Sequence, residues 1–494
     1  MHTSNREEWH CEGGVRLSDV VPEARFLACS EIVVGRCCDD PDLCGPGDVF
    51  IAREGAIGEA NEAARVALAN GAAAIISETV LPTGGLPLGI VPNTDWAYAR
   101  LCHALAGDPA RRLRVIAITG TSGKTTTVWL TAAVLAEAGL RVGVVSDLGC
   151  LDASGMDVER GGVDDAAALA IWLERLAASG CTHAVVEVSS RMLAAHALAG
   201  VECDMVVVTN LADAHRDLHG SQEAYHDIKA RILDSLSDDG CLIVNGDDER
   251  LQRFVTRCST ERPAAGTITV GLHAGDLTAT PIERSLFGQT FLMHAGGHTI
   301  PVAVAPPVAS FVRNALLAAA VGIRGRVPLE RIARGIESAG CVSGRVERLD
   351  RGQDFAAFLD LPTSGHALAS TLASLRRLTP GRLVVLAEEG IADALGGLGR
   401  FVIRSAKWCD DCLIAPANIA SEDAGDSVVA AYARIDRTLA GLGAGDCLLV
   451  LGDALREASP SGDPESGELG LVDVVDGWLQ LAHPPRQPAG RRAA

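Results

Sequence analysis

Short apolar runs alternate with longer amphipathic stretches along most of this 494-residue chain. The runs are rich in valine and isoleucine, which favour buried strands, and the stretches between them have the length and periodicity of helices. In the middle of the chain the predicted strands are residues 115–119, 142–146, 184–188, 205–209 and 241–244. Strands that alternate with helices predict a mostly parallel sheet with helices on both faces.

Similar patterns flank this central region. Before it, predicted strands at 48–52 and 72–77 enclose a predicted helix at 59–70. After it come an amphipathic segment at 329–336, a break near 338–344, and further predicted strands at 355–359, 383–386, 412–415 and 447–451. We therefore predict a small N-terminal α/β domain (1–112), a central domain (113–340), a Rossmann-like C-terminal α/β domain (341–482), and a disordered tail (483–494).

The formal charge of −20 at pH 7 argues against a general affinity for nucleic acid or an anionic membrane, because both would be repelled. The first residues are polar, and no uncharged apolar run reaches the roughly 18 residues that span a bilayer. We expect a cytoplasmic, monomeric protein that acts on small molecules. The fifteen cysteines, an odd number, indicate apolar fillers more than a disulfide framework.

Cys409 and Cys412 have the spacing of half a metal or redox site. No second pair accompanies them, and the two acidic residues between them disfavour thiolates. Metal binding there is the minor alternative.

The scarcity of lysine draws attention to three positions. Of the 43 lysines and arginines, only Lys124, Lys229 and Lys407 are lysines. A compact ammonium can touch a phosphate, and a lysine can also react as a neutral amine, which a guanidinium cannot do. Lys124 and Lys229 lie inside chemical motifs, whereas Lys407 lies in none and is interpreted as a surface charge.

A turn punctuated by glycines follows the predicted strand that ends at Thr119. It reads Gly120-Thr121-Ser122-Gly123-Lys124-Thr125-Thr126-Thr127. The glycines let backbone N–H groups turn inward, Lys124 can reach the β- and γ-phosphates of a nucleotide, and Thr125 can ligate Mg²⁺. The spacing is the short Gly-x-x-Gly-Lys-Thr. A purely structural turn is the alternative, but the Lys-Thr pair between a strand and a helix favours a phosphate-binding loop.

Three further residues carry candidate chemistry. Glu187 lies at the end of a predicted buried strand, where open α/β sheets place ligand groups. His215 follows in a stretch rich in His and Asp, and Lys229 completes a Tyr225-x-x-x-Lys229 spacing. Each signal alone is weak, because a carboxylate at a strand end is often solvated and His215 with His219 could form an ordinary polar face.

Together, the order and spacing of these motifs resemble the Mur ligase family, the ATP-dependent amide-forming ligases of peptidoglycan synthesis, and most of all its MurE type. The resemblance covers most of the chain. The matching segments are 46–52, 120–127, 187–190, 209–211, 225–229, 245–248 and 344–347, with Asn314 in a predicted helix.

The resemblance implies a site for ATP and Mg²⁺. The residues it implies at the phosphates are Gly120, Thr121, Ser122, Gly123, Lys124, Thr125, Thr126 and Arg345, and those around the adenosine are Asn245, Asp247 and Asn314. It also implies that Thr125 holds Mg²⁺ and that Glu187, His215 and an N-carboxylated Lys229 ligate a second divalent ion. Lys124, Glu187, His215 and Lys229 would be the catalytic residues. The implied reaction transfers the γ-phosphate to a substrate carboxylate, after which the amine of an amino acid displaces phosphate.

The motifs for the other substrates depart from the family pattern. Asp164 and Asp165 occupy the place where a sugar diphosphate would approach, so we expect repulsion there. Arg191 replaces a histidine, Ala197 replaces an arginine expected at the nucleotide sugar, and Ala214 replaces a carboxylate beside His215. In the third domain, segments 360–365, 387–392 and 416–419 lack the motifs that would read a diamino acid.

Two hypotheses therefore stay open. The first is a ligase that joins an amino acid to a carboxylate, with a nucleotide-sugar peptide as the suspected acceptor. The alternative is a catalytically impaired paralogue that binds nucleotide and acts as a scaffold or regulator in cell-wall synthesis. An unrelated phosphate-loop ATPase would not explain Glu187, His215 and Lys229 at this spacing.

Overall fold

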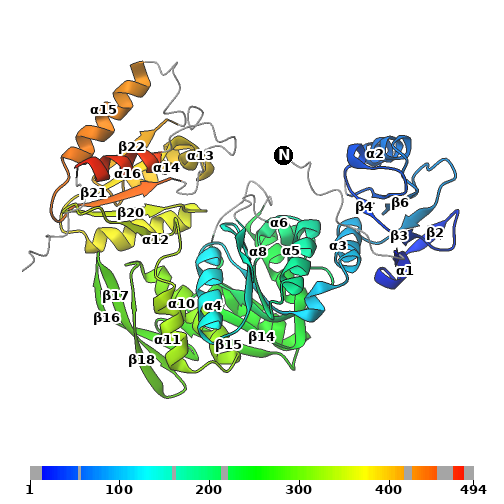
Figure 1. The fold of residues 1–494 in the computed structure, drawn as a ribbon, viewed down its shortest axis with the longest axis horizontal. Coiled ribbons are helices and arrows are strands. Elements are labelled where there is room, and N and C mark those ends of the chain that lie inside the picture. Colours follow the sequence, from blue (N-terminus) through cyan, green and yellow to red (C-terminus); the bar gives the residue numbers. More distant parts are fainter. Residues whose placement is uncertain are drawn as a thin grey trace, which may run out of the picture.

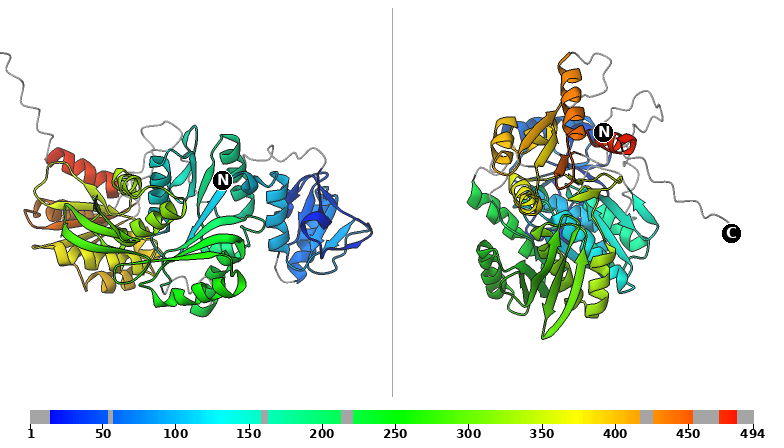
Figure 2. Two further views of the ribbon diagram at one scale, coloured as in Figure 1. Left: turned by 90° about the horizontal axis from the view of Figure 1, so that it is seen from below. Right: turned by 90° about the vertical axis from the view of Figure 1, so that its left-hand side faces the viewer.

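Three α/β units lie in a row in the computed structural model of the chain (Figure 1). The structure describes residues 14–53, 57–157, 163–212, 221–416, 426–452 and 471–482. The N-terminal unit, in blue, and the C-terminal unit, in yellow, orange and red, lie at opposite ends of the central unit in Figure 1 and in the left view of Figure 2. Within the described ranges, no helix is long and apolar enough to cross a membrane.

The N-terminal unit has a five-stranded sheet of order β2-β7-β6-β5-β4 and a separate β1-β3 pair. Its strands are β1 (Val15–Arg16), β2 (Arg25–Leu27), β3 (Val33–Val34), β4 (Cys37–Cys38), β5 (Val49–Ile51), β6 (Ala74–Ser77) and β7 (Leu88–Ile90). Its helices are α1 (Leu17–Val20), α2 (Ile57–Ala69) and α3 (Thr94–Leu105), with 3-10 turns η1 (Pro41–Leu43) and η2 (Pro109–Arg112). The strands predicted at 48–52 and 72–77 and the helix predicted at 59–70 are confirmed as β5, β6 and α2.

The central unit is built on an eleven-stranded sheet of order β11-β10-β9-β12-β8-β13-β14-β15-β16-β17-β18. Its strands are β8 (Arg114–Thr119), β9 (Val142–Ser146), β10 (Gly149–Asp152), β11 (Gly155–Asp157), β12 (His183–Glu187), β13 (Cys203–Val208), β14 (Leu236–Asn245), β15 (Gly266–Gly271), β16 (Leu277–Ser285), β17 (Gly288–Ala295) and β18 (His298–Val304). Strands β9, β12, β8, β13, β14 and β15 run parallel, which confirms the predicted sheet. The antiparallel extension β16–β18 was not predicted.

Helices cover both faces of this sheet. One face carries α4 (Lys124–Glu137), α10 (Ala309–Arg324) and α11 (Leu329–Ser338). The other carries α5 (Ala166–Ala178), α6 (Ser190–Ala194), α8 (Gln222–Ala230) and α9 (Gln252–Glu261), with 3-10 turns η3 (Arg231–Ser235) and η4 (Glu249–Leu251). Along β8, Val115 and Ala117 face one core while Ile116 and Ile118 face the other. The continuous apolar runs are therefore explained by burial on both faces.

The C-terminal unit has a sheet of order β19-β20-β23-β21-β22, in which only the edge strand β19 is antiparallel. Its strands are β19 (Glu347–Leu349), β20 (Ala356–Asp360), β21 (Leu383–Glu388), β22 (Asp411–Ala415) and β23 (Cys447–Leu451). Its helices are α12 (Gly365–Leu378), α13 (Glu389–Ala394), α14 (Leu398–Ser405), α15 (Asp426–Ala440) and α16 (Leu471–Ala482). The strands predicted at 355–359, 383–386, 412–415 and 447–451 are confirmed as β20, β21, β22 and β23.

The exact domain limits stay a prediction. Helix α3 lies before the predicted limit at 112, yet it shares a core with α5 of the central unit. The predicted tail at 483–494 lies outside the described residues. At the other junction α12 meets α10, so the C-terminal unit closes over one end of the central sheet.

Candidate nucleotide and metal site

The predicted phosphate loop connects the end of β8 to the start of α4. Gly120 and Gly123 have φ angles of 149° and 80°, a region that glycine adopts without strain. A Cβ on Gly120 would collide with Thr209 Oγ1, and one on Gly123 would come within 2.6 Å of Asn314 Oδ1. Both glycines are therefore required by backbone conformation and by close packing.

The end of the neighbouring strand β13 holds this loop in place. The Thr121 N–H donates to the Asn210 carbonyl at 3.0 Å, and the Ser122 N–H donates to Asn210 Oδ1 at 3.1 Å. Thr209 Oγ1 donates to the Ser122 carbonyl at 2.6 Å. The Thr121 side chain is buried, where its hydroxyl pairs with that of Tyr225 at 3.1 Å, so it braces the loop from behind.

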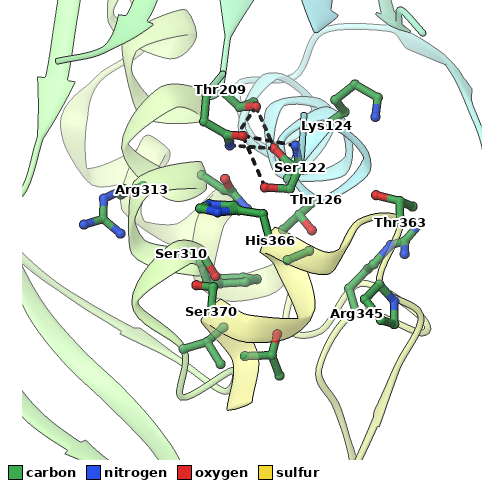
Figure 3. Close-up of a pocket in the computed structure, with 18 of the residues that line it drawn as sticks. Ser122, Lys124, Thr126, Thr209, Ser310, Arg313, Arg345, Thr363, His366 and Ser370 are labelled. Carbon is green, nitrogen blue, oxygen red and sulfur yellow. Dashed lines mark hydrogen bonds between the residues drawn. The ribbon is translucent and has the colours of Figure 1, made fainter. Parts of the chain in front are cut away.

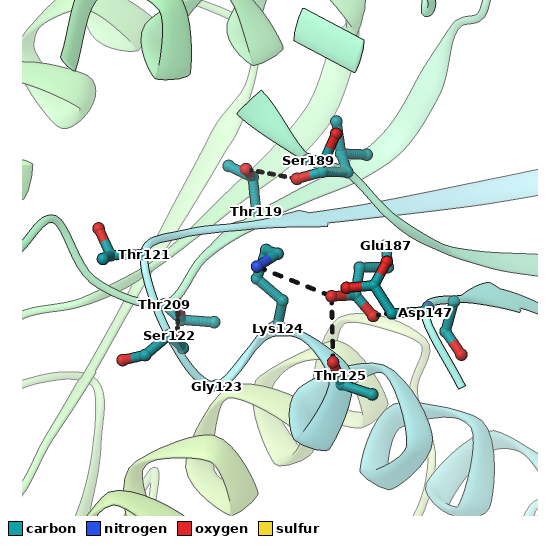
Figure 4. A network of polar contacts seen from close by, with 12 residues as sticks. Thr119, Thr121, Ser122, Gly123, Lys124, Thr125, Asp147, Glu187, Ser189 and Thr209 are labelled. Atoms are coloured by element: carbon teal, nitrogen blue, oxygen red, sulfur yellow. Dashed lines mark hydrogen bonds and ion pairs between the residues drawn. The ribbon is translucent and has the colours of Figure 1, made fainter. Parts of the chain in front are cut away.

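Lys124, Thr125 and Asp147 surround Glu187 at the carboxyl ends of the strands (Figure 4). Lys124 Nζ lies 3.7 Å from Glu187 Oε1, and Thr125 Oγ1 donates to the same oxygen at 3.1 Å. The Asp147 N–H donates to Glu187 Oε2 at 3.3 Å. Burial raises the pKa of Glu187 to about 7, while the Lys124 ammonium acts in the opposite direction. A carboxylate and a hydroxyl at this edge are oxygen donors of the kind that Mg²⁺ prefers.

Lys229 lies behind the loop and is fully buried. Its Nζ donates to Thr119 Oγ1 at 2.9 Å, and that hydroxyl donates to the Val188 carbonyl at 2.8 Å. Burial lowers the pKa of Lys229 well below its usual value, and the charge of Lys124 acts in the same direction. The structure thus brings Lys229 near Glu187 and Lys124, as a shared metal site would need. His215, the other predicted ligand, lies outside the described residues.

A cavity of about 350 Å³ opens in front of the loop. Residues 122–126 line one side of it, and Asn245, Asp247 and Asn314, predicted around adenosine, line another. Asp247 accepts from the Leu272 N–H at 2.9 Å and from Arg313 Nε at 3.1 Å. Burial would raise the pKa of Asp247, but these donors outweigh burial and hold it below its usual value.

The C-terminal unit supplies the remaining wall (Figure 3). Arg345 donates to Thr125 Oγ1 at 3.4 Å and to the Leu361 carbonyl, so its guanidinium spans the two units. Thr363, His366 and Ser370 also face the cavity, and sequence reasoning missed them. Segment 360–365 was interpreted only as a departure from a family motif. The cavity depends on the packing of α12 against α10, a contact between segments far apart in the sequence.

The residues present fit ATP with Mg²⁺. The loop leaves no room for a Cβ, its N–H groups lie at the start of α4, and Lys124 and Arg345 bring positive charge to the same cavity. Thr125 and Glu187 supply oxygen donors beside it.

Comparisons with known proteins agree with this arrangement. A sequence profile of the Mur ligase middle domain matches residues 118–322. A UDP-N-acetylmuramoyl-L-alanyl-D-glutamate–2,6-diaminopimelate ligase of Corynebacterium efficiens is 34% identical over 369 residues, which cover 72% of this chain and 69% of that protein. A UDP-N-acetylmuramyl-tripeptide synthetase of Roseiflexus sp. is 30% identical over 358 residues, or 69% and 70% of the two chains. The chain belongs to the Mur ligase family.

Solved structures of Mur ligases share its three-domain fold. A 2,6-diaminopimelate ligase structure superposes with a TM-score of 0.67 at 21% identity, covering 89% of this chain and 93% of the other. A Thermotoga maritima MurF structure in complex with ADP gives a TM-score of 0.54 at 17% identity, covering 84% and 93%. The Mur ligases are ATP-dependent acid–amino acid ligases, and the predicted fold class and enzyme class of this chain are confirmed.

The residues that depart from the family pattern have partners within the protein. Asp165 caps α5 by accepting from the Ala168 N–H at 2.7 Å. Asp164 accepts from Ser189 Oγ at 3.2 Å and lies 3.4 Å from Arg191 Nη1, so two departures from the family pattern pair with each other. The expected repulsion from two free carboxylates is thereby reduced. Ala197 is buried, with its carbonyl 2.9 Å from His103 Nε2, and presents no side chain to a sugar.

Cys409 and Cys412, the candidate half of a metal site, gain no further ligand from the part of the chain that the structure describes. Cys409 Sγ donates to the Ser405 carbonyl at 3.2 Å, and among the described residues no third ligand joins Cys409 and Cys412. Where Cys38, Cys44 and Asp48 do approach one another, the Asp48 carboxylate already accepts from Arg36 and from the Gly45 N–H.

Proposed function

We propose that this Mur ligase joins an amino acid to the carboxylate of a UDP-N-acetylmuramoyl-peptide in the cytoplasm, using ATP and Mg²⁺. One observation supports it above the others. Lys124 and Thr125 line a cavity that Arg345 borders from the C-terminal unit, and both contact the buried carboxylate of Glu187. The names of the relatives from Corynebacterium efficiens and Roseiflexus sp. specify a UDP-N-acetylmuramoyl-peptide as substrate or product. This supports the choice of acceptor.

Each polar group has a task in this proposal. Loop N–H groups, Lys124 and Arg345 hold the phosphates and neutralise charge during transfer. Thr125 and Glu187 would hold divalent ions, together with His215, and Asn245, Asp247 and Asn314 would bind the adenosine. Bound ATP supplies the γ-phosphoryl group that activates the acceptor carboxylate, so that an amine can displace phosphate and form the amide. Closure by Arg345 limits the access of water to the activated carboxylate.

Lys229 would act as an N-carboxylated ligand in this proposal. A carbamate forms from a neutral primary amine and CO₂, and burial favours the neutral amine of Lys229. The carbamate would add an oxygen donor near Glu187, because the Glu187 carboxylate lies close enough to Lys229 to act on the pKa of its amine.

One observation favours the alternative, a nucleotide-binding paralogue without ligase activity. Asp165 serves as a helix cap, Asp164 and Arg191 bind each other, and Ala197 is buried. The side chains of Asp164, Asp165 and Arg191 thus contact other groups of the protein, and Ala197 offers none to a nucleotide sugar.

The deciding experiment supplies UDP-MurNAc-dipeptide, Mg²⁺-ATP and a mixture of amino acids to the purified chain. We expect ADP together with a new amide, identified by mass spectrometry. ATP binding without turnover would overturn the ligase proposal for this acceptor and support the paralogue.

A further inference from the structure

His366 is the one histidine among the described residues that line the nucleotide cavity. It is the second residue of α12 and is exposed at the cavity mouth. Figure 3 shows its imidazole reaching from α12 toward the side of the cavity that carries Ser122 of the phosphate loop and Ser310 of α10. The side chain therefore faces the central unit from across the junction between the two units.

The start of α12 holds this position firmly. Ser364 caps the helix by accepting from the Ala367 N–H at 3.2 Å. Gly365 fits against the Arg404 guanidinium of α14, where a Cβ would collide with it. Leu368, two positions beyond His366, is fully buried in the core. The ring is thus presented by a fixed helix turn, which is the placement that a ligand contact requires.

Three cations that the central unit contributes to the cavity lie against carboxylates. Arg313 pairs with Asp247 at 3.1 Å, and Arg250 pairs with Asp248 at 2.7 Å. Lys124 lies 3.7 Å from Glu187. The wall formed by α12 otherwise offers only Ala367, Ser370 and Thr371, so His366 is the donor with the longest reach on that wall.

We propose that His366 donates a hydrogen bond to a phosphate of the bound nucleotide and so makes α12 part of the nucleotide site. This inference rests on the proposed function, because it needs ATP in the cavity. Ser122, Thr126 and Ser310 line the cavity together with the ring, and their hydroxyl groups make a polar setting that suits a phosphate better than a purine face.

The test measures the affinity of the full chain for Mg²⁺-ATP and for ADP by titration calorimetry. His366→Phe keeps a ring but removes the donor, and His366→Asn keeps a shorter donor. We expect His366→Phe to weaken both nucleotides by about fivefold to tenfold, since a hydrogen bond to a charged group is lost. His366→Asn should retain most of the affinity. The matched control is His298→Asn, an exposed histidine on the β17–β18 hairpin, which should bind as the wild type does.

The outcomes separate the two proposals. Wild-type affinity in His366→Phe would overturn the inference alone, while the proposed function would stand. Weaker binding in His366→Asn than in His366→Phe would show that the ring stacks, and it would overturn the donor role. A wild-type chain that binds neither ATP nor ADP would overturn the proposed function and this inference with it. Circular dichroism confirms that each variant is folded.

Discussion

The central and C-terminal sheets both end in polar side chains at the carboxyl edge of parallel strands, but they use them differently. At the central edge, Lys124, Thr125 and Glu187 gather beside an open cavity. At the C-terminal edge, Glu388 is buried and accepts from the Leu471 N–H at 3.1 Å, while Asp360, which borders the cavity from the C-terminal side, accepts from the Val346 N–H and from Thr371 Oγ1. The same topology can thus place polar groups where a ligand binds, or it can pair them with other groups of the protein in internal hydrogen bonds.

The largest effect should come from Lys124→Ala. Without its ammonium the developing charge on the transferred phosphate loses a preorganised partner, so we expect kcat to fall by roughly 10³-fold. An assay of ADP release measures it. Lys407→Ala, an exposed lysine of the other unit, is the control and should keep wild-type activity. Equal activity in both variants would show that Lys124 at the central edge does not take part in catalysis.

Lys229→Ala should also abolish most activity, by roughly 10²-fold, because a metal ligand would be lost. Short carboxylates such as acetate or formate should restore part of the rate, since they can supply the missing oxygen. Steady-state kinetics with and without these additives test the carbamate. Indifference to the substitution would exclude it, and loss without any rescue would count against it.

Gly123→Ala should weaken nucleotide binding by roughly tenfold or more, because the new Cβ comes within 2.6 Å of Asn314 Oδ1 and strains the loop. Gly107→Ala is a matched control, because Gly107 has a φ of 79° against 80° for Gly123 but meets no atom within 4 Å. The control should lose about 1 kcal/mol of stability and no affinity. If both variants bind alike, the close packing of the loop is irrelevant to the nucleotide.

Lys229→Met should make the free energy of unfolding less dependent on pH. In the wild type, burial holds the pKa of Lys229 well below its unfolded value, so the unfolded chain binds a proton that the folded chain does not. Wild-type stability should therefore rise with pH between the lowered pKa and about 10.4. Urea titrations in CO₂-free buffer across this window compare it with Lys229→Met and with exposed Lys407→Met. A slope unchanged by Lys229→Met would show that the amine is charged when folded.

Glu388→Gln should have the smallest effect. Its carboxylate meets the first N–H of α16, so removing the charge should cost about 1 kcal/mol or less and leave catalysis unchanged. Exposed Glu389→Gln is the neighbouring control and should be neutral in thermal melts. A large loss of activity in Glu388→Gln alone would show that the C-terminal edge reads a substrate after all.

The sequence predicted most of the sheets and the phosphate loop, because their signals are local. Strand β9 forms at 142–146 as predicted, and the loop follows from a strand end, two glycines and a Lys-Thr pair. The antiparallel strands β16 to β18 lack the continuous apolar runs on which the prediction relied, because many of their side chains are partly or fully exposed.

Contacts between distant segments were harder to predict. Lys229 and Thr119 are 110 residues apart in the chain, and only a family resemblance brought Lys229 to the site. Asp147 beside Glu187 and His366 opposite Ser122 depend on how β9 and α12 are placed in space. The pairing of Asp164 with Arg191 likewise required the fold, because each substitution alone predicted only a lost contact.

The most direct test of the account follows an oxygen atom through the reaction. The acceptor carboxylate is labelled with heavy oxygen, and the inorganic phosphate released with ADP is weighed by mass spectrometry. If the carboxylate is activated by phosphoryl transfer and then attacked by an amine, the phosphate must carry one labelled oxygen. Unlabelled phosphate released with ADP would mean that water accepts the phosphoryl group, and it would contradict the assignment of this site to amide formation.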